Sequence, residues 1–172
     1  MGREIRIKKY SCLLYSEGGT DNGFLESLCN LGKFKDYYAK DWSLRFDHAF
    51  GGSPRDVLER CRRESRGIGY HLILCFIDLD KLKSDYPQKY WQQEKENLEA
   101  EYLAYGIIII WQEDNLEDEY EKVLGKEYRR YGKRGINKIA KEPENLKKFI
   151  NLDYWNKIKN NFVEKEKELE EG

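Results

Sequence analysis

The sequence has few of the residues and patterns that define several classes of protein. It contains only 3 Pro and 1 Met and has no Gly-X-Y period, which excludes a fibrous chain. Its longest strongly apolar stretches are about seven residues, too short to cross a bilayer, so we expect no membrane partner. The basic N-terminus lacks a long apolar segment and a small-residue cleavage site, and we therefore expect no signal peptide.

Net charge is also nearly absent, because 31 basic and 32 acidic residues cancel to −1. The molecule as a whole is therefore not a basic nucleic-acid-binding protein, and any phosphate binding must come from a local basic patch or from a metal ion. The four cysteines are widely spaced, without a C-x-x-C pair or a cluster with His48 or His71, so we expect no zinc site. Cys12 and Cys75 fall in apolar runs, and reduced, buried thiols are typical of a cytoplasmic protein.

Aromatic residues, in contrast, are abundant. The 13 Tyr, 7 Phe and 4 Trp supply enough apolar bulk for a packed core and exclude a disordered chain. The length of 172 residues suits one ordinary domain with an appendage. We predict a catalytic domain over residues 1–125 and, where the composition changes, a basic loop with a C-terminal helical extension over residues 126–172.

Apolar runs alternate with helical patterns through the first part of the chain. The predicted strands are Ser11–Tyr15, Leu44–Phe50, His71–Ile77 and Gly106–Trp111. The first predicted helix starts at Asn22, with Asp21 or Asn22 as its N-cap, and is closed by Gly32. The second covers Arg55–Ser65 and follows the start signal Ser53-Pro54. Two further helices are predicted at Tyr86–Tyr102 and Leu116–Leu124. This alternation, with strands apolar on both faces, predicts an α/β fold: a four-stranded, mainly parallel sheet flanked by helices.

The segment after Gly125 is basic and then helix-forming. Residues 144–171 carry an apolar face that we expect to pack back on the domain, made of Leu146, Phe149, Ile150, Trp155, Ile158 and Phe162. Before it, tyrosines at 128 and 131 alternate with basic residues, namely Arg129, Arg130, Lys133, Arg134, Lys138 and Lys141. This segment either follows a nucleic-acid backbone or is a solvated helix face, and its two glycines favour a loop that binds.

Acidic side chains follow three of the four predicted strands, in a chain whose other carboxylates mostly accompany Lys or Arg on helices. They are Glu17, the pair Asp78 and Asp80, and the pair Glu113 and Asp114. The carboxyl ends of parallel strands meet at one edge, where ligands bind. Carboxylate oxygens suit Mg²⁺, and Glu17 can be a ligand or a general base or acid. Alternatively, the D-x-D pair caps the next helix and Glu17 is a turn residue.

Two sequence blocks carry a family resemblance. LLYSEGGTDNGFLESL resembles the first motif of Toprim domains, an apolar strand followed by Glu-Gly and a helix, and LILCFIDLD resembles their second motif, a strand ending in D-x-D. The first block is most similar to small Toprim-like nucleases of phage-defence and abortive-infection systems, the RloB-like and OLD-type groups. The resemblance covers about residues 9–125 and implies a Toprim-like, Rossmann-like fold.

The same resemblance implies a function. We expect a nuclease that uses Mg²⁺ or Mn²⁺ to hydrolyse phosphodiester bonds of RNA or DNA, with catalytic and metal-binding roles for Glu17, Asp78 and Asp80. Glu113, or else Glu117, is a further candidate ligand. The expected partner is nucleic acid, together with an ATPase or sensor subunit or a second copy of the chain.

Other interpretations stay open. Lys-Leu-Lys after D-x-D departs from the glycine-containing turn often seen in topoisomerases and primases, which argues against those roles. A D-x-D phosphatase requires a hydroxyl residue where Leu82 stands. A non-catalytic Toprim scaffold is a further alternative, although all three acids are retained. Lys81 and Lys83 either contact phosphate or offset the acids, His48 is a weaker catalytic candidate, and His71 is expected to be structural.

Overall fold

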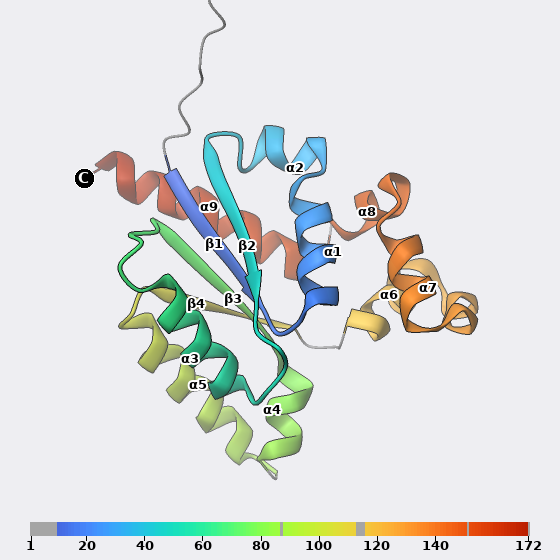
Figure 1. The fold of residues 1–172 in the computed structure, drawn as a ribbon, viewed down its shortest axis with the longest axis horizontal. Helices are drawn as coiled ribbons and strands as arrows, with labels where there is room; N and C mark the ends of the chain where they lie inside the picture. Colours follow the sequence, from blue (N-terminus) through green and yellow to red (C-terminus); the bar gives the residue numbers. More distant parts are fainter. Residues whose placement is uncertain (1–9, 87, 113–115, 151, 172) are drawn as a thin grey trace, which may run out of the picture.

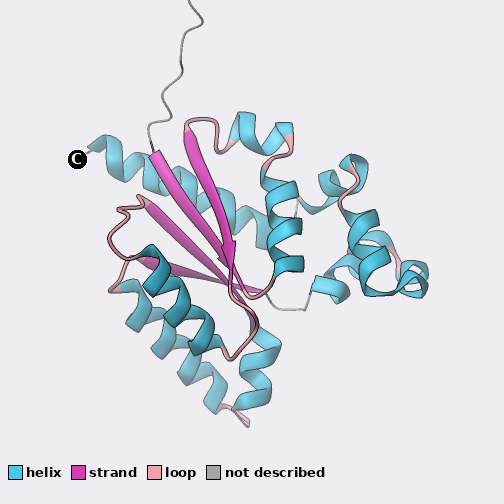
Figure 2. Cartoon of the chain, viewed as in Figure 1, coloured by secondary structure: helices cyan, strands magenta, loops and turns pink. Residues whose placement is uncertain are grey.

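A four-stranded sheet between two layers of helices organises the chain (Figures 1 and 2). The computed structural model describes residues 10–171 except 87, 113–115 and 151. The strands are β1 (Tyr10–Ser16), β2 (Trp42–His48), β3 (Leu72–Asp78) and β4 (Ile107–Gln112). All three pairings are parallel, in the order β2-β1-β3-β4, which confirms the predicted α/β fold.

The order of the strands creates a switch point at the centre of the sheet. From β1 the chain moves outward to β2, and it then returns to the other side of β1 to form β3 and β4. Successive connections therefore leave β1 and β3 in opposite directions. In open α/β sheets, ligands bind outside the carboxyl ends of the two strands at such a point. The fold thus singles out the ends of β1 and β3, where Glu17 and Asp78 lie.

One face of the sheet packs against the first and last helices of the chain. These are α1 (Gly19–Cys29), α2 (Gly32–Tyr37), α6 (Leu116–Leu124), α7 (Gly132–Ala140), α8 (Pro143–Phe149) and α9 (Asp153–Glu171), with a 3₁₀ segment, η1 (Lys126–Tyr131). Cys12 and Leu14 of β1 enter this core beside Phe24 of α1 and Phe162 of α9. Residues on both sides of the predicted boundary at 125 therefore share one core.

The opposite face packs against α3 (Pro54–Ser65), α4 (Leu79–Asp85) and α5 (Tyr90–Leu103). Here the alternate residues of β1, Leu13 and Tyr15, meet Val57 and Leu58 of α3. The central strands are buried on both faces, as their uninterrupted apolar runs predict. All four cysteines are free and buried, in agreement with the expected reduced thiols.

Most predicted bounds agree with the structure to within one residue, and β2 and α1 are among the elements that start two or more residues away from their predicted positions. The strand predicted at Leu44–Phe50 lies two residues earlier, since the ladder with β1 already starts at Trp42. Helix α1 starts at Gly19, three residues before Asn22, because the backbone turns within the glycine pair, with Gly18 as N-cap, and uses no side-chain cap. Gly32 does not close α1 but begins α2.

Three predicted segments are divided or reshaped. The helix predicted at Tyr86–Tyr102 starts later, as α5 at Tyr90, because a separate helix, α4, ends directly before the predicted start. The C-terminal tail forms two helices, α8 and α9, instead of one. The basic segment predicted as a loop is helical, in η1 and α7, because Ile136 and Ala140 anchor it on the core despite its two glycines.

The start of α3 agrees with its sequence signature and yields a first testable prediction. Ser53 Oγ accepts from the backbone N–H of Asp56, the Ser53 N–H donates to the Asp56 carboxylate, and Pro54 is the first helical residue. Replacing Ser53 by Ala should lower the free energy of unfolding by about 1 kcal/mol. Urea denaturation followed by circular dichroism measures it. Ser43→Ala, at an exposed position of β2, is the control, and an equal loss in both variants would contradict the capping role.

Candidate functional site

Glu17 and Asp78 are held together at the switch point. Glu17 directly follows β1 and Asp78 is the last residue of β3, and the backbone N–H of Asp78 donates to Glu17 Oε1 at 2.9 Å. The Glu17 side chain therefore connects the ends of the two central strands. Both side chains are half-buried, at the edge where the carboxyl ends of the strands point (Figure 1).

Asp78 also caps the helix that follows it. Its Oδ1 accepts from the backbone N–H of Asp80 at 2.9 Å, and α4 begins at Leu79 without an intervening loop. The capping interpretation of the D-x-D pair thus holds for Asp78. The bond from Asp80 occupies Oδ1, and the backbone N–H of Lys81 also donates to the Asp78 carboxylate. Asp80 lies exposed in the first turn of α4, beside Asp78 rather than beside Glu17.

The two half-buried acids are electrostatically unfavourable as neighbours. Burial raises the pKa of Glu17, and the negative charges of Asp78 and Asp21 raise it further. The hydrogen bond from the Asp78 N–H and the positive charge of Lys81 lower it. Burial likewise raises the pKa of Asp78, and the nearby Asp80 charge adds to it, whereas hydrogen bonds from the following backbone and Lys81 oppose it. Two carboxylates drawn together against their own repulsion are typical of a site that receives a cation or a proton.

The two lysines that follow D-x-D have different surroundings. Lys81 is close enough to lower the pKa of three carboxyls, those of Glu17, Asp78 and Asp56 at the start of α3. Lys83 instead lies with its Nζ 4.8 Å from the centre of the Trp91 ring on α5. Only Lys81 therefore belongs with the acids, as the positive group that faces them.

A helix N-terminus lies at the same edge. Gly18 is the N-cap of α1 and provides no side-chain cap, so the first-turn N–H groups of the helix are not satisfied in that way. Such N–H groups favour an anion. The expectation that Asp21 or Asn22 caps this helix is wrong, because both lie inside its first turns.

His48 and Phe50 complete the surroundings of the glycine pair. A Cβ placed on Gly19 would lie 3.7 Å from His48 Nε2, so the imidazole lies against the start of α1. His48 Nδ1 lies 2.7 Å from the Ala49 carbonyl oxygen, which can only accept, so Nδ1 is the donor of this contact. The Phe50 ring packs edge-on against His48 and is 85% exposed. Sequence reasoning placed Phe50 inside a strand, although its position before Gly51-Gly52 indicates a turn.

The basic segment lies beside α1, on the side of the molecule to which the strands point (Figure 1). Of the predicted nucleic-acid-binding residues, Arg130 and Arg134 are exposed. Arg130 donates to the Tyr131 hydroxyl at 2.9 Å, and Tyr131 is 47% exposed. The side chains of Arg129 and Lys133 are outside the described part of the structure.

The predicted metal ligands are brought together only in part. Glu17 and Asp78 meet, and Asp80 adjoins Asp78. Among the described residues no group of three or more His, Cys, Asp or Glu is arranged to hold a metal ion. Glu113 and the Glu117 side chain lie outside the described residues, although β4 ends with Gln112 paired to Asp78. His71 accepts from the Ser11 N–H at the opposite edge of the sheet, in agreement with a structural role.

Comparison with known proteins adds no relative: no family model, no curated protein and no solved structure matches this chain. Within the described residues, no helix has the length and apolar character needed to cross a membrane.

Proposed function

We propose that the protein is a metal-dependent nuclease that hydrolyses phosphodiester bonds of RNA or DNA at the Glu17–Asp78 pair. The observation that carries the proposal is the 2.9 Å hydrogen bond that joins these acids across β1 and β3, at the point where parallel sheets bind ligands. These two residues, with Asp80, also match the motifs that resemble Toprim nucleases of phage-defence systems. The sequence motifs and the strand order thus both indicate the edge of the sheet formed by the carboxyl ends of its strands.

The donor set suits Mg²⁺ or Mn²⁺. Mg²⁺ is commonly held by one or two carboxylates, with waters and substrate phosphates completing its shell, so three preassembled acids are not required. Glu17 and Asp78 would hold it, with Asp80 within reach through the first turn of α4. When bound, the ion would supply charge neutralisation at the scissile phosphate and a more acidic water. The raised pKa values of both acids fit, because burial chiefly raises them and a bound cation would stabilise the charged carboxylates against it, as well as against the smaller repulsion from neighbouring acids.

Side chains and backbone groups of the chain can provide the other interactions that phosphodiester cleavage requires, namely phosphate binding, proton transfer and base stacking. Lys81 provides a positive charge for a phosphate oxygen, and the uncapped first turn of α1 provides backbone N–H donors. Glu17, whose pKa burial raises, is the carboxylate that can accept a proton in the site. Phe50 offers an exposed ring on which a base can stack. A nearly neutral protein can in this way bind a polyanion locally.

The direct test is cleavage of labelled single-stranded RNA, hairpin RNA, single-stranded DNA and duplex DNA by the full chain with Mg²⁺ or Mn²⁺. We expect product from at least one substrate and none in EDTA. Asp78→Asn keeps a capping side chain on α4 and removes the charge, and it should reduce the rate by roughly 10²–10⁴-fold. Asp36→Asn, at an exposed position of α2, should leave the rate unchanged.

Two results would contradict the proposal. One is intact substrate across the whole panel with both metals, which would favour the non-catalytic scaffold interpretation. The other is cleavage that Asp78→Asn does not affect, which would assign the activity to a contaminant or to another site.

A further inference from the structure

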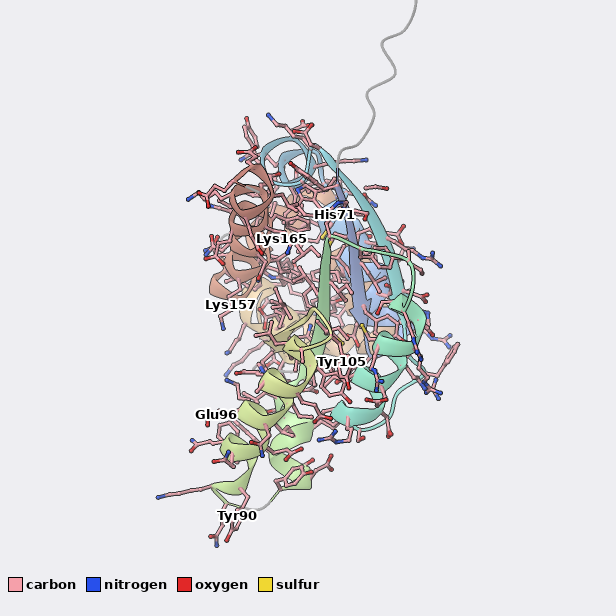
Figure 3. The ribbon with its side chains drawn as sticks, turned by 90° about the vertical axis from the view of Figure 1, so that its left-hand side faces the viewer. His71, Tyr90, Glu96, Tyr105, Lys157 and Lys165 are labelled. Carbon is pink, nitrogen blue, oxygen red and sulfur yellow. The ribbon has the colours of Figure 1, made fainter. Side chains whose placement is uncertain are left out.

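A cavity lies at the amino end of the sheet, opposite the Glu17–Asp78 pair. Its volume is about 380 Å³, and its walls come from the end of α3, the turn that leads into β3, the start of β3 and the segment between α5 and β4. Figure 3 shows Tyr105, which follows α5, beside α3. A cavity of this size is in the range of small-ligand sites. We name it the Arg66 cavity.

Two arginines and two tyrosines dominate the Arg66 cavity. Arg62 and Arg66 come from the end of α3, and Tyr70 and Tyr105 from the segments that precede β3 and β4. No carboxylate lines the cavity among the described residues. Its wall is therefore positive and aromatic, in a protein whose net charge is only −1.

A tight turn forms the rim of the cavity. Arg66 has φ −60° and ψ 127°, Gly67 has φ +78°, and the Ile68 N–H donates to the Ser65 carbonyl at 3.3 Å. These values define a type II turn, which requires a left-handed residue at the position of Gly67. Within the described residues, the N–H groups of Gly67 and Gly69 donate no hydrogen bond, so backbone donors remain available at the rim.

Arg62 is oriented by an aromatic ring more than by an ion pair. Its guanidinium carbon lies 4.1 Å from the centre of the Tyr105 ring, whereas its closest carboxylate contact, to Glu59, is 3.4 Å long and solvent-exposed. Glu59 itself accepts a 2.6 Å hydrogen bond from the Tyr102 hydroxyl. A guanidinium stacked on a ring keeps its N–H edge available for two oxygens of a phosphate.

A cavity of similar size between α3, α4 and α5 provides a contrast. It is about 330 Å³ in volume and also contains an arginine, Arg55. Arg55 donates to both carboxylate oxygens of Glu101 at 2.9 Å and contacts Glu94, which is also in that wall. Its charge is therefore already balanced. In the Arg66 cavity, Arg62 has only its exposed contact to Glu59, and no described carboxylate is paired with Arg66.

We propose that the Arg66 cavity binds a nucleotide through its phosphate and its base, with the arginines and the turn N–H groups on the phosphate and a tyrosine ring against the base. Guanidinium groups recognise phosphate by paired hydrogen bonds, and aromatic faces accept any base. The ligand is either a free nucleoside monophosphate or the 5′-phosphorylated end of a strand, which share this chemistry. The site does not depend on the proposed nuclease centre.

The experiment is calorimetric titration of the full chain, in EDTA, with each of the four ribonucleoside 5′-monophosphates. We expect one saturable site for at least one of them, with weaker binding of inorganic phosphate and of the nucleoside alone. Arg66→Ala and Tyr105→Ala should each weaken binding roughly tenfold, the loss of one charged hydrogen bond or one stacking contact. Both residues lie at the surface, and thermal unfolding will verify that the variants fold.

Arg63→Ala is the matched control, because Arg63 is an exposed arginine of the same helix that does not line the cavity. Equal weakening by Arg63→Ala and Arg66→Ala would overturn the proposal, because it would reflect net charge alone. Absence of saturable binding by all four nucleotides and by a 5′-phosphorylated tetranucleotide would also overturn it. If the phosphorylated tetranucleotide binds more tightly than its 5′-hydroxyl form and than the mononucleotides, the ligand is a strand end. If the mononucleotides bind more tightly than the tetranucleotide, the ligand is a free nucleotide.

Discussion

Glu17→Gln should have two opposite effects: it abolishes metal-dependent cleavage, and it stabilises the metal-free protein. Glutamine keeps an oxygen that can accept from the Asp78 N–H, so the link between β1 and β3 survives. The variant loses the charge that would hold the metal and accept a proton, and the cleavage rate should fall by roughly 10²–10⁴-fold. Removing a half-buried charge beside Asp78 should raise the melting temperature in EDTA.

The pH dependence of this stabilisation follows from the direction of the pKa shift. The folded protein holds the Glu17 proton more tightly than the unfolded chain does, because burial raises the pKa. Its contribution to stability is therefore fully present below the ordinary carboxyl range and is lost as pH rises through the folded pKa. The advantage of Glu17→Gln in EDTA should accordingly be larger near pH 7 than near pH 4.

Metal binding provides the complementary measurement. Mg²⁺ or Mn²⁺ should raise the melting temperature of the natural protein and leave that of Glu17→Gln nearly unchanged, since binding to the folded state alone is stabilising. Glu26→Gln, at an exposed position of α1, is the control and should respond to metal as the natural protein does. If the natural protein shows no shift with metal, or Glu17→Gln lowers the metal-free melting temperature, the metal centre is wrong.

Phe24→Ala should cause the largest loss of stability, about 3–5 kcal/mol in the free energy of unfolding. Phe24 is fully buried in α1, and its ring contacts Tyr120, Phe149 and Trp155 with centroid distances of 5.0, 5.0 and 5.6 Å. Truncation removes three edge-to-face contacts and leaves a cavity between α1 and the C-terminal helices. Urea denaturation followed by tryptophan fluorescence and by circular dichroism measures the loss.

The same experiment tests how the two predicted segments are coupled. Because Phe24 links residues before 125 to residues after it, both signals should report one coincident transition in the natural protein and in the variant. Phe50→Ala is the control, since that ring is 85% exposed, and it should change stability by less than about 0.5 kcal/mol. Two separated transitions, with Phe24→Ala affecting only one, would show that residues 126–172 fold independently.

Local signals located most elements well. The uninterrupted apolar run from Leu72 to Ile77 predicts a central parallel strand because only such a strand is buried on both faces. Helix α6 has the predicted bounds, and the Ser53-Pro54 start of α3 is confirmed by its capping hydrogen bonds. These signals succeed because they depend on backbone and side-chain preferences within a few residues.

Predictions that depended on long-range packing were less accurate. Two glycines around α7 predict a loop, but Ile136 and Ala140 are buried against the core and hold the segment helical. Burial of an apolar face outweighs a helix propensity difference of about 1 kcal/mol for glycine. The start of α1 at Gly19 is a similar case, since its position is set by the end of β1 and not by an N-cap side chain.

By itself, the sequence determined the succession of strands and helices along the chain, the burial of the apolar central strands and the position of acids after strands, because each depends on a local pattern. Only the tertiary structure decided which acids meet. Strand order places β1 beside β3, and this brings Glu17 to the Asp78 N–H while Asp80 turns outward on α4. The tertiary structure also decided that Lys81 faces the acids whereas Lys83 lies on Trp91, because side chains two residues apart on a helix point in different directions.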